Sequence, residues 1–519
     1  MAAFLSLRFI SSDQVRVFIW SGDRPPQLES WRVCMSWRFR DDLATYRPLV
    51  SAVGECIEPT YVRTLSDLHI GRYFALFVSL LLYSTIIIVG RYIFNSKLMA
   101  VIFAATISTS SMIVAFSLIG LSGIAAPLAL IAVASSTGVL LKATIKRGEK
   151  SVVSIGCGTL LYLIGLSLFP AWAMSAFVLM ALALVWQEEL NITNAIRICK
   201  LQLLLAGVTA TYIGMIKVAQ FWYERVSDVK LAPGDYAVTI GSPAELSQRL
   251  SAALLFQAQQ PYLGLVGVYG VFGLMVMGLI SSLVVRSLTG QSATQHSRVL
   301  GLASIAIALM SIVVALTPTL TTTIPLTAHK VAPLLVLVAA GASAVASYSR
   351  SIFKQDLLVA VVFLGLTGLW AGQRATVATT QSAWELNRLE HGAESWLKWG
   401  LPNGRVTLIV IPYEVDPTKS SRFSSLDLRR STNYMELGRG PGDVNRFFPA
   451  LMGVFRTLLP NSPWPLNFTY SAEDALRIPE PSVSVSNDPT FFCNEKAFAI
   501  DLRDGSIGIP PECDQHTRP

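Results

Sequence analysis

The sequence predicts an all-α, polytopic membrane bundle of about ten helices, followed by a C-terminal α/β domain outside the cytoplasm. Hydrophobic residues make up 52% of the 519 residues and charged residues only 14%, whereas soluble domains carry roughly a quarter charged residues. The apolar runs are confined to residues 72–372, and the rest has the composition of ordinary polar sequence. We therefore expect an extracytoplasmic N-terminal segment (1–71), a transmembrane domain (72–372, with an outer loop at 219–261) and a periplasmic C-terminal domain (373–519).

The candidate spans are the runs long enough to cross a bilayer, which takes about 20 apolar residues in a helix. Two boundaries between them depend on short signals, "GLSG" at 120–123 and Pro170. The predicted spans are 72–94, 98–119, 123–142, 152–169, 170–186, 198–218, 262–285, 298–317, 330–348 and 356–372.

Basic residues in the short loops predict the orientation, because cytoplasmic loops carry an excess of Lys and Arg. The loops 142–150, 286–298 and 350–354 are basic, and alternation of the spans puts all three on one side. The pairs Arg91 with Lys97 and Arg197 with Lys200 fall on that side too. Both ends of the sequence then lie outside the cytoplasm. An outer N-terminus favours an additional upstream span, of which "MAAFLSLRFI" would be the outer end; unaided translocation of the polar segment is the alternative.

Four cysteines fall on the predicted outer side, namely Cys34 and Cys56 near the N-terminus and Cys493 and Cys513 near the C-terminus. Two pairs in an oxidising compartment predict two disulfides, and four free thiols are the alternative. We expect the Cys493–Cys513 pairing more strongly, because residues 497–509 between them have the pattern of a β-hairpin.

Three outer segments have the pattern of ordered structure. Trp31, Cys34 and Trp37 recur every three residues in 29–39, which indicates an amphipathic helix at the membrane interface. Ser242 and Glu245 form a capping box that begins a second interfacial helix. The C-terminal domain is expected to contain a helix at 381–400, a strand at 405–412, a helical run at 443–459 and the hairpin.

The span interiors contain almost no ionisable residues, which argues against an ion-driven carrier but leaves open a lipid flippase with a path lined by hydroxyl groups. The chemistry is therefore expected on the outer side. Asp13, Asp41 and Asp42 are candidate general bases for an acceptor hydroxyl. The alternative is a solvated juxtamembrane segment.

Basic and aromatic residues of the outer side could bind a lipid-linked phosphate and a sugar, since guanidinium groups recognise phosphate oxygens in bidentate fashion. Acidic pairs could also hold Mg²⁺ or Mn²⁺. The sequence has no zinc-type Cys/His spacing and no phosphate-binding glycine loop. We expect no nucleic-acid partner. The candidate phosphate contacts are Arg47, Arg63, Arg72, Arg225, His329 and Lys330, and the candidate sugar-stacking residues are Trp222 and Tyr223.

Four stretches give the chain a resemblance to a known family. They are "SSDQVR" (11–16), "YRPL" (46–49), "LFPAWAMSAF" (168–177) and "TNYMELG" (432–438). With the many spans and the outer C-terminal domain, they resemble the GT-C glycosyltransferases, and within them the bacterial O-antigen glucosyltransferases of serotype conversion. The chain departs from the family pattern at Gln14, at Phe169 in place of Gln, and at His329-Lys330 in place of Arg.

The resemblance implies that Asp13 is the catalytic base, with Asp41 or Asp42 as its rival, and that Arg16, Arg47 and Lys330 contact the carrier phosphate. It also implies a location in a bacterial inner membrane, and transfer of a sugar from a polyprenyl-phosphate donor to a surface polysaccharide or lipid-linked glycan at its outer leaflet. The alternatives are a flippase or transporter of lipid-linked glycan and a non-catalytic envelope protein.

Overall fold

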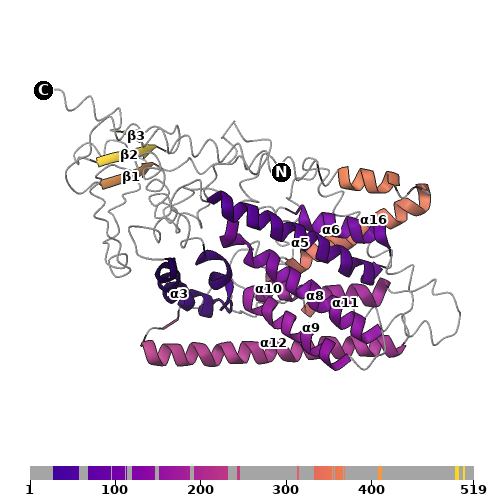
Figure 1. Cartoon of the computed structure of the whole chain (residues 1–519), viewed down its shortest axis with the longest axis horizontal. Helices are drawn as coiled ribbons and strands as arrows, with labels where there is room; N and C mark the ends of the chain where they lie inside the picture. Colours follow the sequence, from indigo (N-terminus) through magenta and orange to yellow (C-terminus); the bar gives the residue numbers. More distant parts are fainter. Residues whose placement is uncertain are drawn as a thin grey trace.

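The computed structural model describes residues 27–57, 68–110 (without 95), 120–145, 151–186, 192–231 (without 229), 332–353 and most of 355–368, with three strands and a few single positions elsewhere. The described part is helical apart from those strands (Figure 1). Three of its helices are long and apolar enough to cross a membrane, and they lie at Ile70–Phe94, Ala125–Thr144 and Asn194–Ser227.

The helices follow one another along the chain with short breaks. In order they are α3 (Gln27–Ala44), the π-helical turn η1 (Ser51–Glu55), α5 (Leu68–Phe94), α6 (Lys97–Ser108), the 3₁₀ turn η3 (Gly120–Gly123), α8 (Ala125–Ile145), α9 (Ser151–Leu168), α10 (Pro170–Ala173), α11 (Ser175–Trp186), α12 (Ile192–Ser227) and α16 (Ala332–Phe353).

Several predicted helical segments are confirmed. α5, α8, α9 and α16 match the segments predicted at 72–94, 123–142, 152–169 and 330–348, and residues 357–365 are helical within 356–372. The break at Pro170 is confirmed too, because Phe169 is extended and Pro170 starts α10, as expected for a residue that suits the first position of a helix. "GLSG" is a 3₁₀ turn that precedes α8.

The prediction of one continuous helix over 98–119 is wrong, because α6 ends at Ser108. The hydroxyl of Thr109 donates to the carbonyl of Ala105 at 2.7 Å, and the Ser110 hydroxyl accepts from the backbone N–H of Ile113 at 3.4 Å. Ser and Thr side chains offer the backbone such alternatives to a continuing helix. The run of hydroxyl residues after Ile107 therefore ends α6 early.

α12 is longer than predicted, because the helix does not end at 218 but continues to Ser227. Its 36 residues give a length of about 54 Å, whereas the hydrocarbon core of a bilayer is about 30 Å thick. The residues expected to open an outer loop, 219–227, thus form a helical extension of the predicted span.

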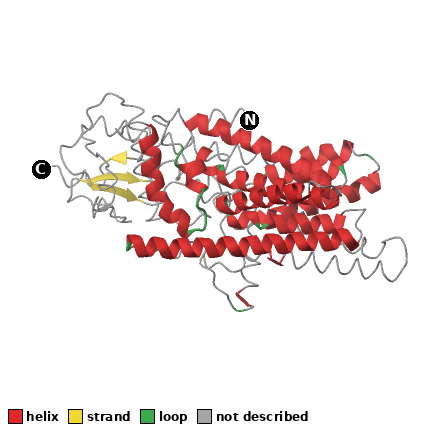
Figure 2. Ribbon diagram, turned by 60° about the horizontal axis from the view of Figure 1, so that its bottom comes forward, coloured by secondary structure: helices red, strands yellow, loops and turns green. Residues whose placement is uncertain are grey.

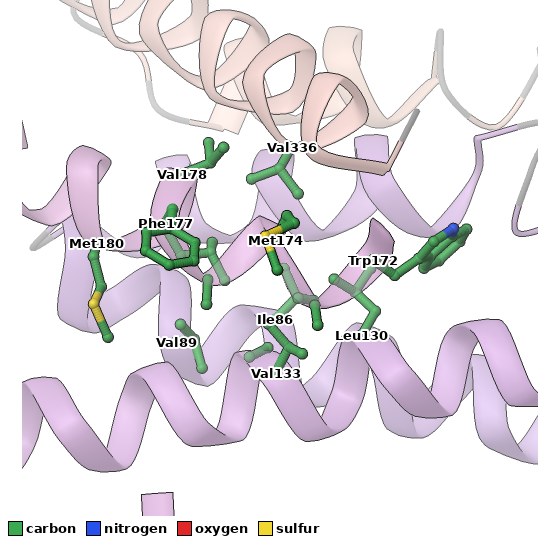
Figure 3. Packing of buried hydrophobic residues seen from close by; sticks show 14 of the residues in the cluster. Ile86, Val89, Leu130, Val133, Trp172, Met174, Phe177, Val178, Met180 and Val336 are labelled. Atoms are coloured by element: carbon green, nitrogen blue, oxygen red, sulfur yellow. The ribbon is translucent and has the colours of Figure 1, made fainter. Parts of the chain in front are cut away.

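α8 lies at the centre of the bundle, with two thirds of its apolar window buried, against one third or less for α5 and α12. Figure 3 shows Met174 between Val336 on one side and Ile86 and Val133 on the other, so α16, α5 and α8 all contribute to one core around the α10–α11 junction. The exposed residues of α5 and α12 include many large apolar side chains, as is common on lipid-facing surfaces.

Small residues let α9 approach α8 closely. A Cβ atom at Gly165 would lie 2.5 Å from Cγ2 of Val133, and one at Gly158 would lie 2.7 Å from Leu140. The Ser136 hydroxyl donates to the carbonyl of Gly158 at 2.7 Å. Both the close approach and the interhelical hydrogen bond are typical of helix packing in membranes.

Among the residues that the structure describes, several basic side chains expected on the cytoplasmic side lie together at one end of the bundle. Arg197, near the start of α12, donates to the carbonyl of Thr144, near the end of α8, at 3.1 Å. Lys142 and Lys200 belong to the same two helix ends. α5 also ends there, because Val89 contacts Gly138 of α8 and Phe94 packs against Trp186. The predicted topology requires these ends of α5, α8, α11 and α12 to lie on the same, cytoplasmic side.

The strands form one small sheet of order β1-β2-β3, from β1 (Thr407–Ile411), β2 (Ala497–Asp501) and β3 (Ile507–Gly508). β2 and β3 are antiparallel, which confirms the predicted hairpin pairing, and β1 confirms the strand expected at 405–412. β1 pairs with β2 in parallel, which the sequence did not indicate. The segments 262–285, 381–400 and 443–459, and all but two residues of 298–317, lie outside the described residues.

Candidate functional site

A short segment after α3, residues 45–50 ("the connector"), joins α3 to η1 and lies at the end of the bundle opposite to the basic one. It begins where α3 ends, with the N–H of Tyr46 donating to Leu43 O at 3.2 Å and that of Arg47 donating to Asp42 O at 2.7 Å. Tyr46 has φ 59°, a left-handed conformation that is uncommon for a bulky residue and tends to occur where surrounding contacts hold it.

Asp42 lies in the last turn of α3 rather than in a loop, and only 1% of it is exposed. Its carboxylate accepts from the Ser51 hydroxyl at 2.9 Å and from the Ser51 N–H at 3.2 Å. Asp42 is therefore buried and hydrogen-bonded across the connector, not solvated. Its role as a base stays a prediction, and the side chain of Asp41 lies outside the described residues.

A disulfide also links α3 to the residue that follows η1. Cys34 of α3 is bonded to Cys56, which follows η1, with Cα atoms 5.5 Å apart and both residues buried. The predicted pairing in the N-terminal segment is thus confirmed, whereas Cys493 and Cys513 lie outside the described residues. Within the part that the structure describes, Cys157 and Cys199 are free thiols.

Arg47 brings two of the stretches that carry the family resemblance together. Its guanidinium carbon lies 4.9 Å from the centre of the Phe169 ring, and its Nε donates to the Thr45 hydroxyl at 3.1 Å. The N–H of Leu49 donates to the carbonyl of Ser167 at 3.2 Å. "YRPL" is therefore seated on the α9–α10 junction, which "LFPAW" forms more than a hundred residues later.

Three side chains of α12 hold the connector from the other side. The Tyr212 hydroxyl donates to Tyr46 O at 2.9 Å, and Gln220 Nε2 donates to Leu43 O at 2.8 Å. The Lys217 ammonium lies 5.1 Å from the centre of the Tyr46 ring. None of the three was among the site residues predicted from the sequence. Tyr212, Ile216 and Gln220 recur every four residues on the inward face, a spacing that could have indicated Tyr212 and Gln220.

The aromatic residues predicted to stack on a sugar lie on the helical extension of α12. Trp222 is 65% exposed, and Tyr223 is half-buried with its ring 6.3 Å from that of Phe39 in α3. Arg225 is exposed. Glu224, in contrast, accepts from the N–H of Leu231 at 2.8 Å and so fixes the turn that follows α12. Of the two predicted stacking residues, Trp222 is therefore the one whose ring is more open to a ligand.

Among the remaining predicted site residues, the structure describes Arg72. Arg72 is 3% exposed at the start of α5. Within the described residues, no group of three or more His, Cys, Asp or Glu side chains could hold a metal ion. The candidates that lie outside the described residues are Asp13, Arg16, Arg63, His329 and Lys330.

The connector and the residues that contact it thus bring two cations, Arg47 and Lys217, and two aromatic rings to one end of the bundle. In Figure 2, α3 stands there beside the C-terminal end of the long α12. Guanidinium and ammonium groups suit a phosphate, and an exposed aromatic face suits a sugar or the membrane interface. Comparison of the chain with family models, with curated proteins and with solved structures found no match.

Proposed function

We propose that the protein is a membrane glycosyltransferase that moves a sugar from a polyprenyl-phosphate donor to a surface polysaccharide or lipid-linked glycan, at the outer leaflet of a bacterial inner membrane. One observation supports the proposal most directly. The "YRPL" segment packs on the "LFPAW" segment through Arg47 and Phe169, although the resemblance had selected the two stretches independently of each other.

The location outside the cytoplasm has separate support. The disulfide between Cys34 and Cys56 is typical of an oxidising compartment, and it adjoins the connector. Arg91, Lys142, Arg197 and Lys200 lie at the other end of the bundle, where the positive-inside rule favours the cytoplasm. The two arguments are independent, and they agree.

In the proposed reaction, the acceptor hydroxyl attacks the anomeric carbon of the sugar while the bond between that carbon and the phosphate oxygen breaks. A carboxylate takes the proton of the hydroxyl, and the carrier phosphate leaves with the electron pair of the broken bond. Arg47 stabilises the charge on the leaving phosphate. Asp13 and Asp41 are the preferred bases, because the Asp42 carboxylate is already bonded to Ser51.

The proposal is tested by Asp13→Asn, Asp41→Asn and Arg47→Gln, each expressed in a strain that lacks the chain. We expect the variant of whichever aspartate is the base to reduce glycan modification about a hundredfold, and Arg47→Gln to reduce it as well, measured by mass spectrometry of the surface glycan. Lys142→Gln, at the opposite end of the bundle, is the matched control and should modify normally.

Full modification by all three variants at normal membrane levels would contradict the proposal. If the wild-type chain moves lipid-linked glycan across reconstituted vesicles without transferring sugar, the flippase alternative is favoured instead.

A further inference from the structure

We propose that Lys217 is a second phosphate-binding residue, which acts together with Arg47 on the headgroup of an isoprenoid phosphate. The inference rests on the proposed function for the choice of lipid, but Lys217 itself is identified from its contacts. It lies on α12 and faces Tyr46, the residue that precedes Arg47 in the connector. The two cations therefore come from different parts of the chain, Arg47 from the connector itself and Lys217 from α12, which contacts the connector at Tyr46.

The aromatic contacts hold both cations in place. The Arg47 guanidinium stacks on Phe169 at 4.9 Å, and the Lys217 ammonium lies over Tyr46 at 5.1 Å. Tyr46 is itself fixed, because its carbonyl accepts from the Tyr212 hydroxyl at 2.9 Å. Cations held on aromatic faces lose less conformational entropy on binding an anion than mobile side chains do.

The charge of Lys217 has no carboxylate to balance it within the described residues. Lys217 makes no ion pair there, and it is exposed. In the proposed topology it also lies at the outer end of α12, where the positive-inside rule gives no reason for a lysine. A compact ammonium with three donors in such a place suits an anionic ligand.

The surroundings of Lys217 indicate that this anion belongs to a lipid. On α12, Ile213 and Phe221 lie one turn before and one turn after Lys217 on the same face, and both are large, apolar and exposed. A ligand that reaches Lys217 along this face must present an apolar chain to the helix and a negative headgroup to the ammonium. An isoprenoid monophosphate has this combination, whereas free phosphate has only the charge.

The test is binding to the purified full-length protein in detergent, measured by calorimetry with three probes: a polyprenyl monophosphate, the polyprenol of the same length, and inorganic phosphate. We expect Lys217→Gln to weaken binding of the polyprenyl monophosphate about tenfold, and Lys217→Arg to restore most of it. Lys200→Gln is the matched control, because Lys200 is an exposed lysine of the same helix at the opposite end. It should bind as the wild type does.

Unchanged affinity in Lys217→Gln would overturn the inference, as would equal binding of the polyprenol or of inorganic phosphate by the wild type. An equal loss of affinity for polyprenol in Lys217→Gln would show a structural role and would overturn it too. The binding assay involves no sugar transfer. If Asp13→Asn abolishes sugar transfer but binding does not depend on Lys217, only the inference about Lys217 is overturned. If binding depends on Lys217 but the wild type transfers no sugar, only the proposed function is overturned.

Discussion

Asp42 and Ser51 join the two ends of the connector through a carboxylate that is 1% exposed. Ser51→Ala removes the 2.9 Å hydrogen bond and leaves that carboxylate oxygen with one partner fewer, which we expect to lower the free energy of unfolding by about 2 kcal/mol. Asp42→Ala should cost a similar amount. Thermal unfolding of the purified protein measures both.

The double variant distinguishes a direct interaction from two separate effects. Because the two residues interact directly, the double variant Asp42→Ala/Ser51→Ala should be only slightly less stable than the single variant Asp42→Ala. A loss equal to the sum of the single variants would contradict the buried bond. Asp42→Asn compared with Asp41→Asn then separates this structural role of Asp42 from catalysis by its neighbour.

Gly165 sets the distance between α8 and α9 at the level of the helices. Gly165→Ala would place a methyl group 2.5 Å from Cγ2 of Val133, and Val133 is buried and stiff at χ1 because it is β-branched. We expect the substitution to lower the stability by about 2 kcal/mol. The measurement is the unfolding temperature or the denaturant midpoint of the purified variant.

Two further variants serve as controls for this contact. Gly156 lies on the same helix with no atom within 4 Å of the added methyl group, so Gly156→Ala should leave the stability unchanged or raise it by up to about 1 kcal/mol, the difference in helix propensity between the two residues. Adding Gly165→Ala to Val133→Ala should cost little, since the clashing methyl group is gone. Equal losses from Gly156→Ala and Gly165→Ala would show that the effect is not due to the α8–α9 contact.

The helices show which local signals in the sequence were sufficient. Pro170 cannot continue a helix, so the boundary between α9 and α10 could be predicted from one residue. The early end of α6 could not, because the hydroxyl of Thr109 is polar but short, and a window of apolar residues hides its bond to Ala105. The length of α12 was not predicted either. Gln220 is polar and follows the apolar run, and its hydrogen bond to Leu43 O is a tertiary contact that the local sequence does not show.

The bundle as a whole has one basic end and one end that carries the connector. We predict that the basic end faces the cytoplasm and that the connector faces the outside. Val226, 75% exposed at the end of α12, and Lys142, exposed at the end of α8, report on the two ends. In a chain with Cys157→Ser and Cys199→Ser, we expect Val226→Cys to react with a membrane-impermeant maleimide in intact cells. Lys142→Cys should react only after permeabilisation. The opposite pattern would invert the topology and remove the proposed outer site.

The sequence by itself determined the helical class, most helix positions, the basic end of the bundle and a cysteine pair in the N-terminal segment, because each depends on composition or on neighbours close along the chain. Only the tertiary structure decided what surrounds Tyr46 and Arg47. Phe169 and Lys217 lie far from the connector in sequence, and no local pattern specifies which distant helix will meet a turn. The burial of Asp42 depends in the same way on how η1 folds back, so its carboxylate looked exposed until Ser51 was found bonded to it.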